Sequence, residues 1–126
     1  MLVRKPDDEG FGLVELIIAI FLFAVITVAL VPALISGIVY SAQQSTTATA
    51  TRQLNALVEQ ARQAPTCASL AGAAAMQSFK DGSGQPFTTS GTVGTCTSGT
   101  AVSLALTAKD QKGATIGIVN ALVYVP

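Results

Sequence analysis

FGLVELIIAIFLFAVITVALVPALISGIVY, residues 11–40, is the stretch that decides the fold. Its only charged residue is Glu15, and no charged residue follows until Arg52. A helix that crosses a bilayer needs about 20 predominantly apolar residues, so this run is more than long enough. The sequence therefore predicts that residues 11–40 form a membrane-spanning helix.

Residues 1–10, MLVRKPDDEG, are polar and charged, and Pro6 argues against a helix through them, so we interpret them as a leader. A cleaved secretory signal has an apolar region of about 7 to 15 residues, which is shorter than the run that follows. The helix should therefore stay in the product. Arg4 and Lys5 precede the run, and basic residues favour the cytoplasmic side. We expect a single-pass protein of the cytoplasmic membrane with a cytoplasmic N-terminus.

Residues 41–64 continue the helix with a different character, because they are polar and contain no Gly or Pro. Their apolar residues recur on one face at the helical period: Ala50, Leu54, Leu57, Val58 and Ala61. One helix from about Phe11 to Ala64 is ~80 Å long, which is far more than a bilayer needs. The amphipathic part should therefore lie outside the membrane. We expect its apolar face to pack on its own domain rather than on a partner helix.

Residues 65–126 form a small extracytoplasmic domain of loops and short strands in this interpretation. Residues 102–106 and 115–125 have the composition of strands, and the polar turn at 109–113 between them indicates a hairpin. A further strand is expected within residues 87–96. Because residues 115–125 carry apolar side chains on both faces, we expect this last strand inside the sheet. The predicted fold is α+β, with a long N-terminal helix packed on a small antiparallel sheet.

Cys67 and Cys96 are the only cysteines, and both fall on the predicted exterior side, where disulfides persist. A domain of this size has a marginal core and benefits from a crosslink. Closing a loop of about 30 residues would contribute about 3 to 4 kcal/mol. We favour a structural disulfide over two free thiols, and the spacing is not that of a redox CxxC motif.

Composition narrows the classes of function. Among 126 residues the formal net charge is zero, so no strong field attracts nucleic acid, and the cations beyond residue 51 are scattered. The chain has no histidine, which removes imidazole bases and the usual imidazole metal ligands. After Glu59 the only acids are Asp81 and Asp110, which fall short of a calcium ligand set. We expect no enzyme, no cofactor, no metal and no small-molecule substrate.

Glu15 needs a functional explanation, because inserting a carboxylate into a bilayer within a helix costs roughly 2.5 to 3.5 kcal/mol of free energy. The ordinary explanation is a carboxylate in the headgroup region of a plain anchor. Cleavage between Gly10 and Phe11, however, would create an α-amine one helical turn before Glu15. An amine of the same or a neighbouring chain could then neutralise the carboxylate.

The run Gly10-Phe11-Gly12-Leu13-Val14-Glu15-Leu16, after a short basic leader and before an apolar helix, resembles the processing motif of the type IV pilin superfamily. The resemblance implies that a prepilin peptidase cuts after Gly10 and methylates the amine of Phe11. It also implies that Glu15 engages a neighbouring subunit's N-terminus during assembly. Pro32 matches a proline common in these helices, where its missing N–H donor loosens the helix.

Four features depart from the pattern of major pilins in that family. Gly12 replaces the usual Ser or Thr, and Ala24 replaces a helix-loosening glycine. The leader is unusually acidic, and Phe21 with Phe23 makes the helix bulkier. These departures favour a minor pilin or a pseudopilin.

We therefore expect a structural subunit of a type IV pilus or related filament, which moves from the membrane into an extracellular filament. Its expected partners are prepilin peptidase, other pilin or pseudopilin subunits, an inner-membrane assembly platform and membrane lipid. The alternative from another class is a single-pass anchor that displays a small binding module, keeps residues 1–10 and is not assembled. An enzyme ranks third, because no nucleophile–base pair is visible.

Overall fold

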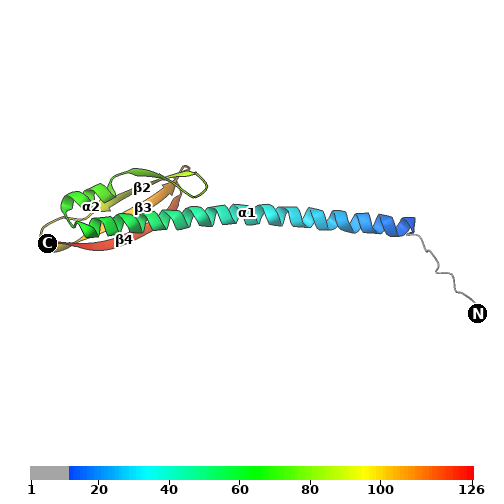
Figure 1. Cartoon of the computed structure of the whole chain (residues 1–126), viewed down its shortest axis with the longest axis horizontal. Coiled ribbons are helices and arrows are strands. Elements are labelled where there is room, and N and C mark those ends of the chain that lie inside the picture. The colour runs from blue at the N-terminus through cyan, green and yellow to red at the C-terminus, as the bar shows by residue number, and fades with distance from the viewer. Residues whose placement is uncertain (1–11) are drawn as a thin grey trace, which may run out of the picture. The chain divides into compact units, whose positions relative to one another are not determined.

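The structure is a computed structural model that describes residues 12–126, and it has an α+β fold, which confirms the predicted fold class (Figure 1). The predicted leader, Gly10 and Phe11 lie outside the described residues. The chain divides into two compact units, with the boundary between Val39 and Tyr40. The elements in chain order are α1 (Leu13–Gln63), α2 (Cys67–Ala74), β1 (Gln77–Lys80), β2 (Pro86–Val93), β3 (Thr100–Asp110) and β4 (Thr115–Val125).

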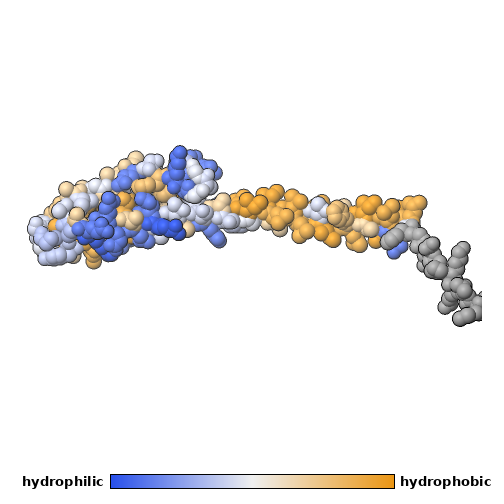
Figure 2. Space-filling model, in the orientation of Figure 1, coloured by the Kyte–Doolittle hydropathy of each residue, from blue (hydrophilic) through white to orange (hydrophobic). Residues whose placement is uncertain are grey.

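The first unit contains the apolar segment of α1, residues 13–39, and every one of its side chains is exposed. Figure 2 shows this apolar stretch of helix as bare hydrophobic surface. It is long and apolar enough to cross a membrane. Thr27, one of its few polar residues, donates its hydroxyl to the carbonyl of Phe23 at 2.6 Å, so the hydroxyl is satisfied within the helix. Among the described residues of this unit, no other helix or strand packs on the segment.

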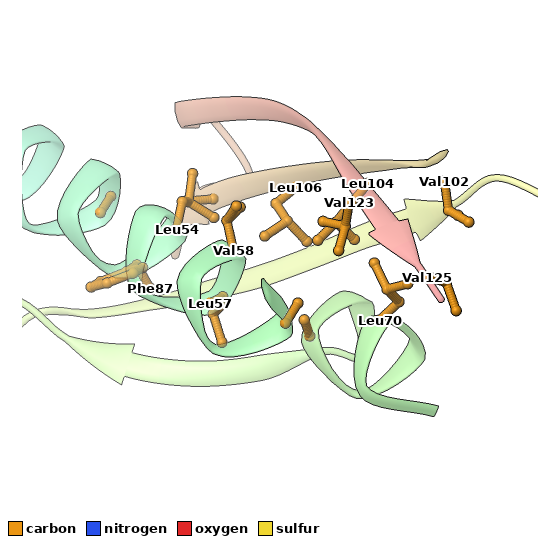
Figure 3. Close-up of a cluster of buried hydrophobic side chains, with 14 residues drawn as sticks. Leu54, Leu57, Val58, Leu70, Phe87, Val102, Leu104, Leu106, Val123 and Val125 are labelled. Atoms are coloured by element: carbon orange, nitrogen blue, oxygen red, sulfur yellow. The ribbon is translucent and has the colours of Figure 1, made fainter. Parts of the chain in front are cut away.

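The second unit begins with the amphipathic segment of α1, residues 40–63. It buries the five residues that the 3.6-residue period predicts, which are Ala50, Leu54, Leu57, Val58 and Ala61. These side chains point at the sheet, where Phe87 and alternate residues of β3 and β4 meet them (Figure 3). The period of the apolar residues thus identified the packing face correctly.

The sheet is an antiparallel meander of order β1-β2-β3-β4. β3 is its most regular buried strand: Val102, Leu104, Leu106 and Ala108 alternate toward the helices and are all buried. α1 comes close to β4 at Gly117, where a Cβ atom would lie 3.3 Å from Leu54 Cδ1. A glycine there lets the helix approach the strand backbone.

The prediction that residues 115–125 form an interior strand is wrong, because β4 pairs only with β3 and lies at the edge of the sheet. Val123 and Val125 face the core, whereas Ile118, Leu122 and Tyr124 face outward and are exposed. Ile116 differs from Ile118, although the two would share one face of a regular strand. A register irregularity between Ala108 and Lys109 shifts the pairing there, and Ile116 packs against the core.

Two short elements escaped the sequence analysis, α2 and β1. Thr66 caps α2: its hydroxyl accepts from the N–H of Ser69 at 3.1 Å, while the Ser69 hydroxyl accepts from the N–H of Thr66 at 3.3 Å. Such a reciprocal cap satisfies two N–H donors that a helix start otherwise leaves unpaired. α2 places Leu70 in the core. Cys67, at its first residue, forms a disulfide with Cys96 in the loop between β2 and β3.

Candidate functional site

The candidate site is the apolar segment of α1, and Glu15 stands in its first turn. A carboxylate at a helix N-terminus lies near unpaired N–H groups and the positive end of the helix dipole, so its charge is tolerated there. The helical hydrogen bonds begin in this first turn, where the N–H of Leu16 donates to the carbonyl of Gly12 at 3.1 Å. Glu15 is exposed and, among the described residues, has no ion-pair partner. Glu15 is the one acidic or basic residue of the apolar segment.

Around and beyond Glu15 the helix is apolar on all sides. Its large side chains are each about half exposed or more, up to 76% for Leu13. A helix that is hydrophobic all round needs a surrounding of lipid or of other helices. Ala24, Val25, Val28 and Ala29 line a shallow hollow on it, and small residues of this kind allow close approach of a second helix.

Pro32 lies inside α1, and the helix continues through it. Proline has no N–H, so the carbonyl of Val28 lacks its usual hydrogen-bond donor one turn later. Glu15 and Pro32 are thus placed on the same bare segment, whereas Cys67 and Cys96 lie in the second unit.

The second unit holds one polar contact that sequence reasoning missed. Asp81 is buried, and its carboxylate accepts from the hydroxyl of Thr46 on α1 at 2.6 Å. It also accepts from the hydroxyl and the N–H of Ser83 and from the N–H of Gln85. The bonds from Thr46 and Ser83 lower the pKa of Asp81 to about 2, against a weaker opposing effect of burial. The contact fixes the turn after β1 on the helix.

The signal for this contact is present in the sequence as a turn. Residues 81–85, DGSGQ, have the spacing D-x-x-G-x, and residues 110–114, DQKGA, repeat it. In both turns the Asp carboxylate accepts two backbone N–H groups and the glycine has a φ near +80°. What the sequence does not reveal is that the first turn reaches Thr46.

The described residues show no cluster of metal-ligating side chains. Residues 12–126 contain no group of three or more His, Cys, Asp or Glu side chains that could hold a metal ion. A hollow of about 570 Å³ in the second unit lies between α1 and the turns at 81–85 and 110–114. Its lining is mostly amide, hydroxyl and aliphatic, with one Asp and one Lys at the second turn.

Comparison with known proteins identifies the N-terminal region. The family model of the prokaryotic N-terminal methylation motif matches residues 6–31, which include the Gly10-Phe11 junction, Glu15 and the first part of the apolar segment. The chain therefore carries the prepilin signal of type IV pilins and has a single described helix able to span a membrane. This motif supports processing of the chain as a type IV pilin-like prepilin. No curated protein and no solved structure matches the chain.

Proposed function

We propose that this protein is a structural subunit of a type IV pilus or a related filament, with a minor pilin or pseudopilin role favoured. The observation that carries the proposal is the bare apolar segment of α1, with Glu15 in its first turn, directly inside a matched methylation motif. A helix of this kind needs cover on every side. Lipid supplies the cover before assembly, and the helices of neighbouring subunits supply it afterwards.

Glu15 supplies an interaction that favours neighbouring subunits over lipid as the surroundings of the helix. Cleavage after Gly10 would free the amine of Phe11, which on a neighbouring chain is the natural counter-ion for the carboxylate. An ion pair gains much more where packed helices exclude water than it does in water. Each docking subunit would therefore be held in the register that joins its carboxylate to a neighbouring amine.

Other residues of the segment favour a minor pilin or pseudopilin over a major one. Phe21 and Phe23 are 66% and 72% exposed, so each projects a ring that neighbours must accommodate. Ala24 stands where many major pilins have a helix-loosening glycine, and Pro32 is the one proline within α1. A subunit present in few copies can use bulky side chains against particular neighbours, whereas a repeating core favours small ones.

Arg4 and Lys5 support a cytoplasmic N-terminus, because basic residues favour that side of the membrane. The disulfide supports an exterior second unit, because disulfides persist in oxidising surroundings. The partners are prepilin peptidase, other pilin or pseudopilin subunits, an inner-membrane assembly platform and the lipid around α1. The subunit itself performs no reaction.

The decisive experiment is mass spectrometry of the mature N-terminus in a host with active prepilin peptidase. We expect a product that begins at N-methylated Phe11. Gly10→Val should block cleavage, because it places a branched side chain at the scissile bond. Gly12→Ala is the matched control and should be processed normally, since a Cβ there meets nothing within 4 Å.

An intact N-terminus in that host would reject the pilin proposal. It would favour the plain membrane anchor, which keeps residues 1–10 and displays the second unit as a binding module.

A further inference from the structure

The outer face of the sheet carries an unexplained apolar row. Ile118, Leu122 and Tyr124 of β4 are 63%, 66% and 60% exposed and point away from both helices. Within residues 40–126, only Tyr40 and Met76 are other large hydrophobic side chains with this degree of exposure. Three such residues on one face of one strand form a patch and not isolated surface residues.

Beside this row lies a strip of small side chains on β3. In the register of the two strands, Ile118 stands opposite Thr107, Leu122 opposite Ser103 and Tyr124 opposite Ala101. Between them Asn120 stands opposite Ala105. The outer face is thus a ridge on β4 next to a low step on β3.

This face is also free of charge. No Asp, Glu, Lys or Arg occurs in residues 115–126, and the outward residues of β3 are uncharged between Ala101 and Thr107. Exposed edge strands usually carry Lys, Pro or an inward charge that prevents association. β4 has an irregularity at its start but no charge and no internal proline.

We propose that this face binds a second copy of the chain, with the two sheets face to face around a two-fold axis parallel to the strands. Such an axis places β4 of each copy over β3 of the other at the same height. Leu122 then rests on the partner copy's Ser103, Ile118 on Thr107 and Tyr124 on Ala101. The ridge and the step are complementary to themselves, which an interface between identical surfaces requires.

Edge pairing would leave the apolar row uncovered. Two β4 edges can pair around a two-fold axis only as antiparallel strands, which extends the sheet and keeps Ile118, Leu122 and Tyr124 of both copies exposed. The face-to-face arrangement covers the row in both copies. The face-to-face arrangement keeps both copies parallel, and because α1 and α2 pack on the opposite face they do not obstruct it.

The interface is modest, and this suits a reversible state. Three exposed side chains amount to a few hundred Å² of apolar surface, below the ~800 Å² per partner of a typical stable complex. Confinement in one membrane raises the effective concentration and compensates for a small area. The proposal rests on the membrane insertion of α1 that the proposed function requires.

The test uses the full chain in liposomes, where the second copy is the only protein partner present. A photoreactive benzoylphenylalanine at Leu122 should yield a crosslinked dimer, and its attachment point should map to residues 101–107 of the other copy. The same probe at Asn55, an exposed position on α1, is the matched control and should yield at least tenfold less. With the probe at Tyr124, Ile118→Lys with Leu122→Lys should reduce the dimer at least tenfold. Asn55→Lys, at the exposed control position on α1, should not.

Four results would overturn the proposal. Equal crosslinking from positions 122 and 55 would show random collision, and attachment within residues 115–125 would show edge pairing. Inserted, disulfide-intact protein that yields no dimer would reject this inference and leave the filament proposal standing. Protein that carbonate extracts from the liposomes would fail at membrane insertion, and the filament proposal would then fall as well.

Discussion

The two segments of α1 have the same backbone structure and opposite relations to the rest of the molecule. Residues 13–39 are apolar on every side and bury nothing, whereas residues 40–63 carry one apolar stripe and bury it completely. The amphipathic segment finds its partner, the sheet, in its own chain. The apolar segment must find partners elsewhere. On the proposed function, the amphipathic segment serves folding and the apolar segment serves assembly. Substitutions in the first should therefore lower stability, and substitutions in the second should lower incorporation into filaments.

The largest effect is expected at Glu15, in the apolar segment. Glu15→Gln keeps the size of the side chain and removes its charge, which would leave a neighbour's amine unpaired among packed helices. An uncompensated buried charge costs about 3 to 5 kcal/mol, so incorporation into filaments should fall about a hundredfold or more. The measurement is the ratio of filament-associated to membrane-retained subunit. Glu15→Asp should be intermediate, because it keeps the charge on a shorter side chain.

Folding supplies the control for this prediction. The Glu15 variants should be inserted and processed, and their second unit should keep its disulfide and protease resistance. Incorporation of the Gln variant at the wild-type level would reject the assigned role. A variant that lost the folded second unit would contradict the separation between the two segments.

The converse prediction concerns Leu54, in the amphipathic segment. Leu54 is fully buried against the sheet, and its replacement by Ala should lower the free energy of unfolding of the second unit by about 4 kcal/mol. Leu22→Ala is the matched control on the exposed segment and should leave that free energy unchanged. Pulse proteolysis of the full chain in detergent micelles measures both. Equal losses in the two variants would show that the segments fold as one unit.

A somewhat smaller effect is expected from the bond that joins α2 to the loop after β2. Replacing both Cys67 and Cys96 by Ala should cost about 3 kcal/mol of stability in the second unit without affecting leader cleavage. Reduction of the wild-type disulfide should give a similar loss in the same proteolysis assay. Alkylation of either cysteine in exported, unreduced protein would contradict the bond.

The smallest effect should come from Asp81, which docks one of the two D-x-x-G-x turns on the amphipathic segment. Its pKa is about 2 in the folded protein against an ordinary 3.8, so its stabilising effect is complete above about pH 4 and is lost as the pH falls toward 2. Asp81→Asn should remove this part of the acid sensitivity in a pH series of unfolding measurements. Asp110→Asn, in the turn that does not bond to α1, is the matched comparison and should cost less at neutral pH. Equal losses would show that Thr46 contributes nothing.

Sequence reasoning predicted those features that depend on long periodic patterns. The charge-free run after Glu15 and the stripe from Ala50 to Ala61 are such patterns, and they identified the helix, its two characters and its packing face. α2 was missed because its cap is Thr66 with Ser69 in place of the usual acid or amide, and its body is mostly small residues. β1 was missed because four residues are too few to establish an alternation.

The error at β4 has a different physical origin. Apolar residues on both faces of a strand indicate burial on both faces only if the surface has no other use for them. Ile118, Leu122 and Tyr124 are apolar and yet exposed. The prediction took their apolar character as a sign of burial, and it therefore placed an edge strand inside the sheet. The candidate site was more predictable than the topology, because a processing motif is local in sequence. The bond between Asp81 and Thr46 joins positions 35 residues apart, and no local pattern encodes it.

The turn at residues 110–114 is self-contained. Asp110 accepts the backbone N–H groups of Lys112 and Ala114, Gly113 takes the left-handed conformation, and the flanking strands pair without help from α1. Lengthening such a loop costs only about 0.6 kcal/mol for each doubling of its length. This turn is therefore the place to insert an epitope or a short binding peptide, whereas the turn at 81–85 would lose its anchor to the helix. A filament that tolerated the insertion would present the foreign peptide once for every copy of the subunit.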